Sequence, residues 1–176
     1  MRLGRDLLPD ATLISPRGDV DEHGAARFFR RMAEGRYDMA DLARATAKMA
    51  GFVAAHRAEH PGARLVGLGY SNGANILASV IFASRDLFDD AVLMPPLIGW
   101  EPAPGAVTTR VLITAGERDA ICPPPLTRQL AGWFRAQGAP VDIAWHPGGH
   151  ALDASEVGAA TRFLSQTEVA ADGRPR

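Results

Sequence analysis

The sequence has few of the features that direct a protein out of the cell or onto a charged polymer. Its 176 residues include one cysteine, Cys122, so an internal disulfide is excluded and a reducing compartment is expected. No run of about 18 apolar residues is present, and the first ten residues lack the apolar segment of a signal peptide. The formal net charge of -1 gives no reason to expect nucleic acid or a membrane as a partner. These absences favour a cytoplasmic protein.

Apolar segments typical of buried strands alternate along the chain with segments patterned as helices. This alternation predicts an α/β fold, with a mostly parallel sheet covered by helices on both faces. A chain of 176 residues can bury a substantial core, so we predict one domain over residues 1–176 with a flexible tail at 171–176. Residues 17–35 have the pattern of a loop. The expected strands are 11–15, 64–70, 91–94, 110–115 and 141–145, and the expected helices are 37–60, 74–84, 123–138 and 156–164.

A serine lies in a glycine-flanked turn between an expected strand and an expected helix. Residues 69–73, Gly-Tyr-Ser-Asn-Gly, have the G-x-S-x-G spacing of a nucleophile elbow. In such a turn the serine backbone is strained and its hydroxyl points away from the sheet, while Gly69 and Gly73 are expected to avoid a Cβ clash. The helix start also places the backbone N–H of Asn72 where a developing oxyanion would lie. The alternative is an ordinary glycine-rich turn.

An acid and a histidine each follow a later expected strand. Asp119 comes after the strand at 110–115, and His150 comes after the strand at 141–145. The carboxyl ends of parallel strands lie at one edge of a sheet, so we expect Ser71, Asp119 and His150 to meet there. A serine hydroxyl needs a base, and the base needs an orienting acid. The order Ser, Asp, His is that of the α/β-hydrolase arrangement, with Ser71 as nucleophile, His150 as base and Asp119 as the orienting acid.

Other side chains compete for the same roles. Glu117 also follows the strand at 110–115, but it lies closer to the end of the sheet than Asp119. His146 lies nearer the end of its strand than His150 and precedes a proline, so we interpret it as an anchor of the loop. Cys122 has no elbow around it, and a small apolar filler is the simpler interpretation.

The sequence contains no pattern that indicates a metal or cofactor site. Its 5 histidines are scattered, without H-x-x-x-H or carboxylate spacing suited to a metal ion. Gly67 and Gly69 lead into the serine turn rather than a G-x-G-x-x-G motif, and no Walker lysine follows. We therefore expect chemistry without a metal or cofactor.

Four segments of the chain resemble bacterial members of the phospholipase/carboxylesterase family of α/β-hydrolases. In order they are LLPDATLISPRGDVDEHGAARFFRRMAEGRYDMADL, GLGYSNGANI, VLITAGERDAICPP and WHPGGH, and the resemblance runs over nearly the whole chain. It implies a serine esterase that acts on small carboxylic esters without a cofactor, often as a homodimer. It also assigns the triad to Ser71, Asp119 and His150, and one oxyanion donor to the backbone N–H of Asn72.

The beginning of the sequence departs from this family. Family members carry further N-terminal residues, with early strands and a His-Gly-x-Gly loop that supplies the second oxyanion donor. Here the first helix is expected at residues 4–8, and the family's strand between 11–15 and 64–70 has no counterpart. We therefore expect an N-terminally truncated sheet, either as part of a longer natural protein or with 11–15 paired directly to 64–70. An exposed edge in such a sheet favours self-association.

The leading functional hypothesis is a serine carboxylesterase that forms an acyl-enzyme intermediate. Thioesterase or lysophospholipase activity is the near variant, which the sequence does not separate from it. A catalytically impaired hydrolase-like domain that binds a ligand is the alternative from a different class. The Phe28-Phe29 loop and the loop at 97–100 are the candidate walls of a substrate pocket.

Overall fold

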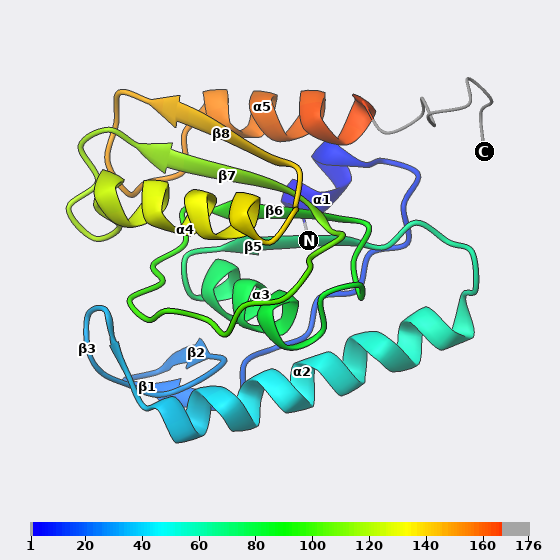
Figure 1. Ribbon diagram of the computed structural model, residues 1–176, viewed down its shortest axis with the longest axis horizontal. Coiled ribbons are helices and arrows are strands. Elements are labelled where there is room, and N and C mark those ends of the chain that lie inside the picture. The colour runs from blue at the N-terminus through cyan, green and yellow to red at the C-terminus, as the bar shows by residue number, and fades with distance from the viewer. Residues whose placement is uncertain (1, 167–176) are drawn as a thin grey trace.

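A computed structural model describes residues 2–166, which form a parallel sheet with helices on both faces (Figure 1). The tail predicted at 171–176 lies outside the described residues. The helices are α1 (Arg2–Leu7), α2 (Met39–Glu59), α3 (Asn72–Ala83), α4 (Pro124–Ala136) and α5 (Ala154–Ser165), and the strands are β1 (Val20–Glu22), β2 (Ala25–Arg27), β3 (Arg31–Ala33), β4 (Arg36–Tyr37), β5 (Val66–Tyr70), β6 (Asp90–Met94), β7 (Arg110–Gly116) and β8 (Val141–His146).

The sheet has the order β5-β6-β7-β8, and all three pairings are parallel. The residues of β6 alternate between two buried apolar layers, as strands covered on both faces do. Ala91 and Leu93 face the layer that contains α3 and α4, whereas Val92 and Met94 face the layer that contains α1 and α5. The predicted α/β fold with helices on both faces is therefore confirmed.

The long helix α2 packs on α3 through the first half of its length. Asp38 caps its start by accepting a hydrogen bond from the Asp41 backbone N–H at 3.0 Å. Leu42 and Ala45 are buried against Ile76 of α3. Further along, Phe52 is 37% exposed and lines a cavity, while Val53 beside it packs against the core.

The prediction of a strand at residues 11–15 is wrong. These residues form no strand, and Ile14 is 48% exposed. An apolar run becomes a strand only where a neighbouring backbone satisfies its hydrogen bonds, and β5 is the edge of the sheet among the described residues. A cavity of about 280 Å³ has Ile14 and the residues of β5 in its wall. The direct pairing of 11–15 with 64–70 is therefore not formed.

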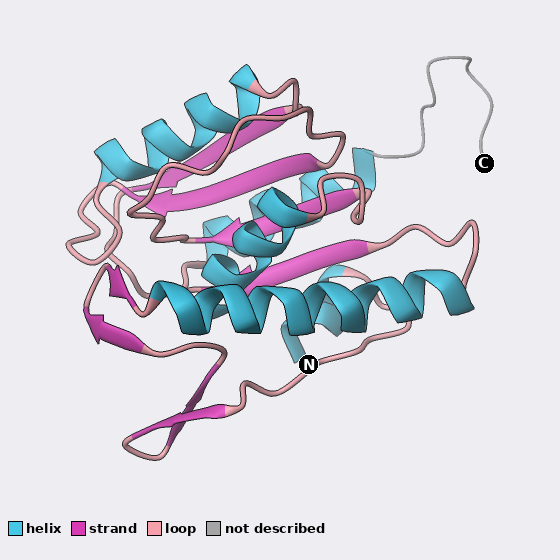
Figure 2. Ribbon diagram, turned by 60° about the horizontal axis from the view of Figure 1, so that its bottom comes forward, coloured by secondary structure: helices cyan, strands magenta, loops and turns pink. Residues whose placement is uncertain are grey.

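Residues 17–35, expected to be a loop, contain the antiparallel hairpin β1–β2 and the first strand of a second hairpin, β3–β4, which ends at Tyr37. Figure 2 shows them at the amino-terminal end of α2, outside the layers that cover the sheet. His23 and Gly24 connect β1 to β2 with φ of 54° and 87°, which suits the type I′ turn of a two-residue hairpin. The strands have two or three residues each, so they are too short for an alternating pattern to show in the sequence.

A buried carboxylate holds the amino-terminal ends of three strands together. Asp90 begins β6, and its side chain is 1% exposed. It pairs with Arg64, just before β5, at 2.7 Å and with Arg110, at the start of β7, at 2.8 Å.

Within the described part of the chain, no helix is long and apolar enough to cross a membrane.

Replacing Asp90 by asparagine is expected to lower the free energy of unfolding by about 2–3 kcal/mol, because both guanidinium groups lose a buried anionic partner. The loss is smaller than for a fully buried pair, since both arginines are partly exposed. Urea unfolding measures the change. The exposed Asp142 of β8 gives the control variant Asp142→Asn, expected to change the free energy by less than about 0.5 kcal/mol. Equal losses in the two variants would contradict this account.

Candidate active site

Ser71 occupies a strained turn between β5 and α3. Its φ of 52° and ψ of -115° lie outside the regions that L-residues ordinarily adopt. Gly69 permits the turn, because a Cβ there would lie 2.4 Å from the carbonyl oxygen of Gly73. Gly73 differs from the expectation, since a Cβ there would meet only Phe28, at 4.0 Å. The backbone N–H of Ser71 donates to the carbonyl oxygen of Met94 at 2.6 Å, which ties the turn to the end of β6.

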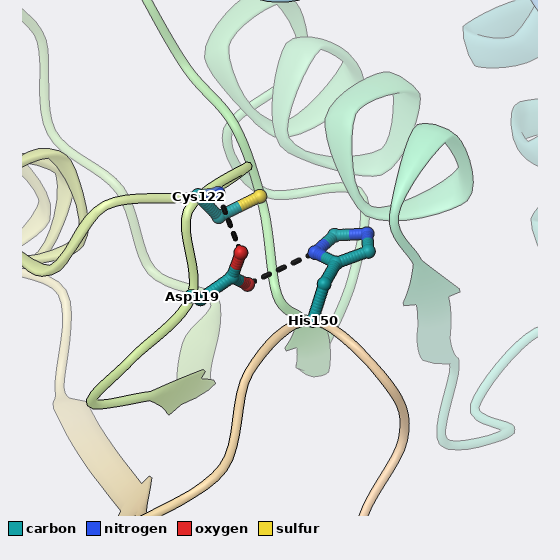
Figure 3. Close-up of side chains that lie close together, drawn as sticks. All are labelled: Asp119, Cys122 and His150. Atoms are coloured by element: carbon teal, nitrogen blue, oxygen red, sulfur yellow. Dashed lines mark hydrogen bonds and ion pairs between the residues drawn. The ribbon is translucent and has the colours of Figure 1, made fainter.

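The structure brings the three predicted residues into one hydrogen-bonded chain. His150 Nε2 lies 3.0 Å from Ser71 Oγ, and His150 Nδ1 lies 2.9 Å from Asp119 Oδ2. The second contact is drawn in Figure 3. The side chain of Asp119 is fully buried, and its other oxygen accepts the backbone N–H groups of Ile121 and Cys122. One carboxylate oxygen is thus fixed by the backbone, which aims the other at the imidazole.

The loops that carry Asp119 and His150 are joined by backbone contacts. The N–H of Glu117 donates to the carbonyl oxygen of His146 at 2.8 Å, and the N–H of Arg118 donates to that of Gly148 at 2.9 Å. Gly116 permits the approach, since a Cβ there would lie 2.4 Å from the Gly149 carbonyl oxygen. Asp119 and His150 therefore lie on two loops that backbone hydrogen bonds hold together.

The two competing residues take other positions. The side chain of Glu117 is exposed and makes no contact with His150 among the described hydrogen bonds. His146 ends β8 and is 3% exposed. Its Nδ1 accepts the Gly148 N–H at 3.2 Å, in keeping with its interpretation as a loop anchor.

Tyr70 contributes a contact that the sequence analysis missed. Its hydroxyl donates to the carbonyl oxygen of His150 at 3.0 Å, and the two rings are 5.8 Å apart. Partial burial and, less strongly, the negative charges of Glu156 and Asp119 raise the pKa of Tyr70, so the hydroxyl remains a donor. The available signal was the position of this tyrosine inside the G-x-S-x-G motif, directly before the serine.

Cys122 lies close to the acid and the base (Figure 3). A carboxylate oxygen of Asp119, the sulfur of Cys122 and a ring nitrogen of His150 lie within 4.8 Å of one another. Burial raises the pKa of Cys122 to about 12, so the thiol stays protonated near neutral pH. A thiol attacks substrates as the thiolate, so this environment does not suit a nucleophile.

Asn72 links the turn to the hairpin region. It begins α3, so its backbone N–H is one of the helix-start groups that lack an intrahelical acceptor. Its side-chain oxygen accepts the N–H of Phe28 at 2.9 Å. Phe28 therefore lies beside the turn and lines the 280 Å³ cavity, whereas Phe29 is fully buried in the core. In the loop at 97–100, which was the other candidate wall of a substrate pocket, Leu97 and Ile98 are buried.

Comparisons with known proteins identify relatives that match most of the length of this chain. No protein-family model matches the chain. MhqD of Bacillus subtilis (strain 168), named as a hydrolase, is 36% identical, over 96% of this chain and 86% of MhqD. The structure of Atu2452 from Agrobacterium tumefaciens str. C58, a protein of unknown function, is 55% identical with a TM-score of 0.88, over 93% of this chain and 81% of Atu2452.

A carboxylesterase from Bacillus cereus is 34% identical with a TM-score of 0.88, over 94% of this chain and 80% of the esterase. A phospholipase/carboxylesterase from Dyadobacter fermentans shares the fold, with a TM-score of 0.64 over 72% of this chain and 64% of that chain, at 20% identity. The resemblance drawn from the sequence motifs is confirmed by these relatives. The chain belongs to the phospholipase/carboxylesterase family of the α/β-hydrolase superfamily.

Proposed function

We propose that this hydrolase cleaves small carboxylic esters through an acyl-enzyme formed on Ser71. The observation that carries the proposal is the continuous chain Asp119–His150–Ser71, with contacts of 2.9 and 3.0 Å, at a strained strand-to-helix turn. The carboxylesterase relatives support an ester rather than another acyl substrate. The expected partner is therefore a small ester molecule.

Each step uses a group that the geometry already positions. His150 Nε2 accepts the hydroxyl proton of Ser71 while Oγ attacks the ester carbonyl carbon, and Asp119 stabilises the resulting imidazolium. The backbone N–H of Asn72 donates to the oxyanion. Collapse of the tetrahedral intermediate breaks the bond to the alkoxy group, which takes the proton from His150 and leaves as the alcohol. Water then attacks the acyl carbon as His150 takes its proton, and His150 returns that proton to Ser71 Oγ as the acid is released.

A fluorophosphonate tests the nucleophile directly. The parent protein is expected to gain the mass of one adduct, and Ser71→Ala is expected to gain none, because only an activated serine attacks the phosphorus. Ser84→Ala, at the end of α3, is the matched control and is expected to react like the parent. Intact mass spectrometry gives the result. A folded parent without an adduct, or a Ser71→Ala variant that still reacts, would contradict the proposal.

Cys122 is expected to be unnecessary for the reaction. Its pKa of about 12 means that the reactive thiolate is scarce at pH 8 and becomes common only as the pH approaches that value. Iodoacetamide at pH 8 is expected to alkylate the urea-unfolded protein but not the folded one, as measured by intact mass. The Cys122→Ala variant should keep fluorophosphonate labelling and esterase activity within about threefold of the parent. Rapid alkylation of the folded protein together with loss of ester hydrolysis would instead make Cys122 the nucleophile.

A further inference from the structure

The loop that carries His150, residues 147–153, begins after β8 and ends at α5. Both of its ends meet the same buried carboxylate, Glu156. At the far end, Glu156 Oε2 accepts the backbone N–H of Asp153 at 2.8 Å. At the near end, the same oxygen lies 3.5 Å from Nε2 of His146, the last residue of β8. A single side chain therefore spans the two ends of the loop.

Glu156 is also fixed to the sheet. The hydroxyl of Thr114, in β7, donates to its other carboxylate oxygen. The side chains of Glu156 and His146 are 1% and 2% exposed, so the pair is enclosed by protein. The contacts of the carboxylate thus connect β7, the end of β8 and the start of α5.

The orientation of the His146 ring follows from its neighbours. Its Nδ1 accepts the backbone N–H of Gly148 at 3.2 Å, so in the neutral ring the proton resides on Nε2. That nitrogen faces Glu156 at a separation longer than an ordinary hydrogen bond. The ring is therefore hydrogen-bonded to a loop backbone group on one side and lies against the buried carboxylate, without a hydrogen bond to it, on the other.

The role of Glu156 in capping α5 does not explain why its side chain is buried. Asp153 and Glu156 form a capping box at the start of α5, a motif that works equally well at the surface. Burying a carboxylate is costly unless its oxygens are satisfied, and here one oxygen accepts from Thr114 of β7 and the other from Asp153 at the far end of the loop. A displacement of about 1 Å in a catalytic group is enough to slow a reaction a hundredfold. A device that fixes both ends of the loop therefore bears directly on the position of His150.

We propose that Glu156 and His146 are positioning residues that hold the 147–153 loop so that His150 Nε2 faces Ser71. Neither residue touches the substrate or the reacting atoms. This inference rests on the proposed esterase function, because the effect on the reaction is exerted through His150.

The test compares Glu156→Gln with Asp90→Asn, a substitution of an equally buried carboxylate at the opposite end of the sheet. Glutamine keeps the shape of the side chain but places an NH₂ group where one carboxylate oxygen accepted a hydrogen bond. Glu156→Gln is expected to lower kcat about tenfold with KM within twofold of the parent. Asp90→Asn is expected to lower stability and leave kcat within twofold.

Amide hydrogen exchange supplies a second readout that does not depend on turnover. The amides of Gly148 and Arg118 are expected to exchange faster in Glu156→Gln and at the parental rate in Asp90→Asn. If the parent fails to react with the fluorophosphonate, the proposed function fails, and exchange alone then decides whether Glu156 holds the loop. Parental kcat and parental exchange in Glu156→Gln, with a loss of stability like that of Asp90→Asn, would overturn the inference.

His146→Gln provides a second route to the same answer should Glu156→Gln not fold. It removes the ring that accepts the Gly148 N–H and lies against Glu156, so a loss of kcat and faster exchange at Gly148 are again expected. Where both single variants fold, the double variant should lose no more than the more affected single variant, because residues that act as a unit are not additive. Unchanged kcat and exchange in His146→Gln, or fully additive losses in the double variant, would overturn the inference.

Discussion

The backbone turn at Ser71 is the constraint on which the rest of the structure depends. A non-glycine residue with φ of 52° is held there only because its surroundings fix it. Gly69 leaves room for the Gly73 carbonyl, and the Ser71 N–H is bound to the end of β6. The parallel register from β5 to β8 then carries the other loops to the same edge of the sheet, where Asp119 and His150 reach the hydroxyl.

Buried carboxylates act at both ends of this sheet, with different surroundings. Asp90 meets two arginines at the amino-terminal ends of the strands, where full charges neutralise one another. Glu156, near the carboxyl-terminal ends, is satisfied by a hydroxyl and a backbone N–H, and a histidine faces it. The first arrangement stabilises the strand ends. The second connects β7 to the far end of the 147–153 loop, because its donors are the Thr114 hydroxyl and the Asp153 N–H.

The sequence was sufficient where local pattern and chain direction decide the outcome. The G-x-S-x-G spacing located the turn, and the rule that strand ends share an edge brought Asp119 and His150 to it. The strand at 11–15 was wrongly predicted because an apolar run does not reveal whether a backbone partner lies beside it. The hairpins were missed because two- and three-residue strands carry no period. The burial of Glu156 depends on three elements meeting, which no local pattern encodes.

Some residues of the site are held together by backbone hydrogen bonds and others only by side-chain contacts. This difference decides which contact in the site is most easily broken. Asp119 and His150 lie on loops stitched together by two backbone hydrogen bonds, so displacing one displaces the other. Ser71 lies between β5 and α3, and this turn contacts the two loops through the imidazole of His150 and through the Tyr70 hydroxyl, which donates to the His150 carbonyl oxygen. A displacement of the His150 loop is therefore expected to lengthen the contact between His150 and Ser71 before the contact between His150 and Asp119. In the proposed mechanism, residues that anchor the loop to the sheet therefore act on the proton transfer from Ser71 to His150 more than on the contact of His150 with Asp119.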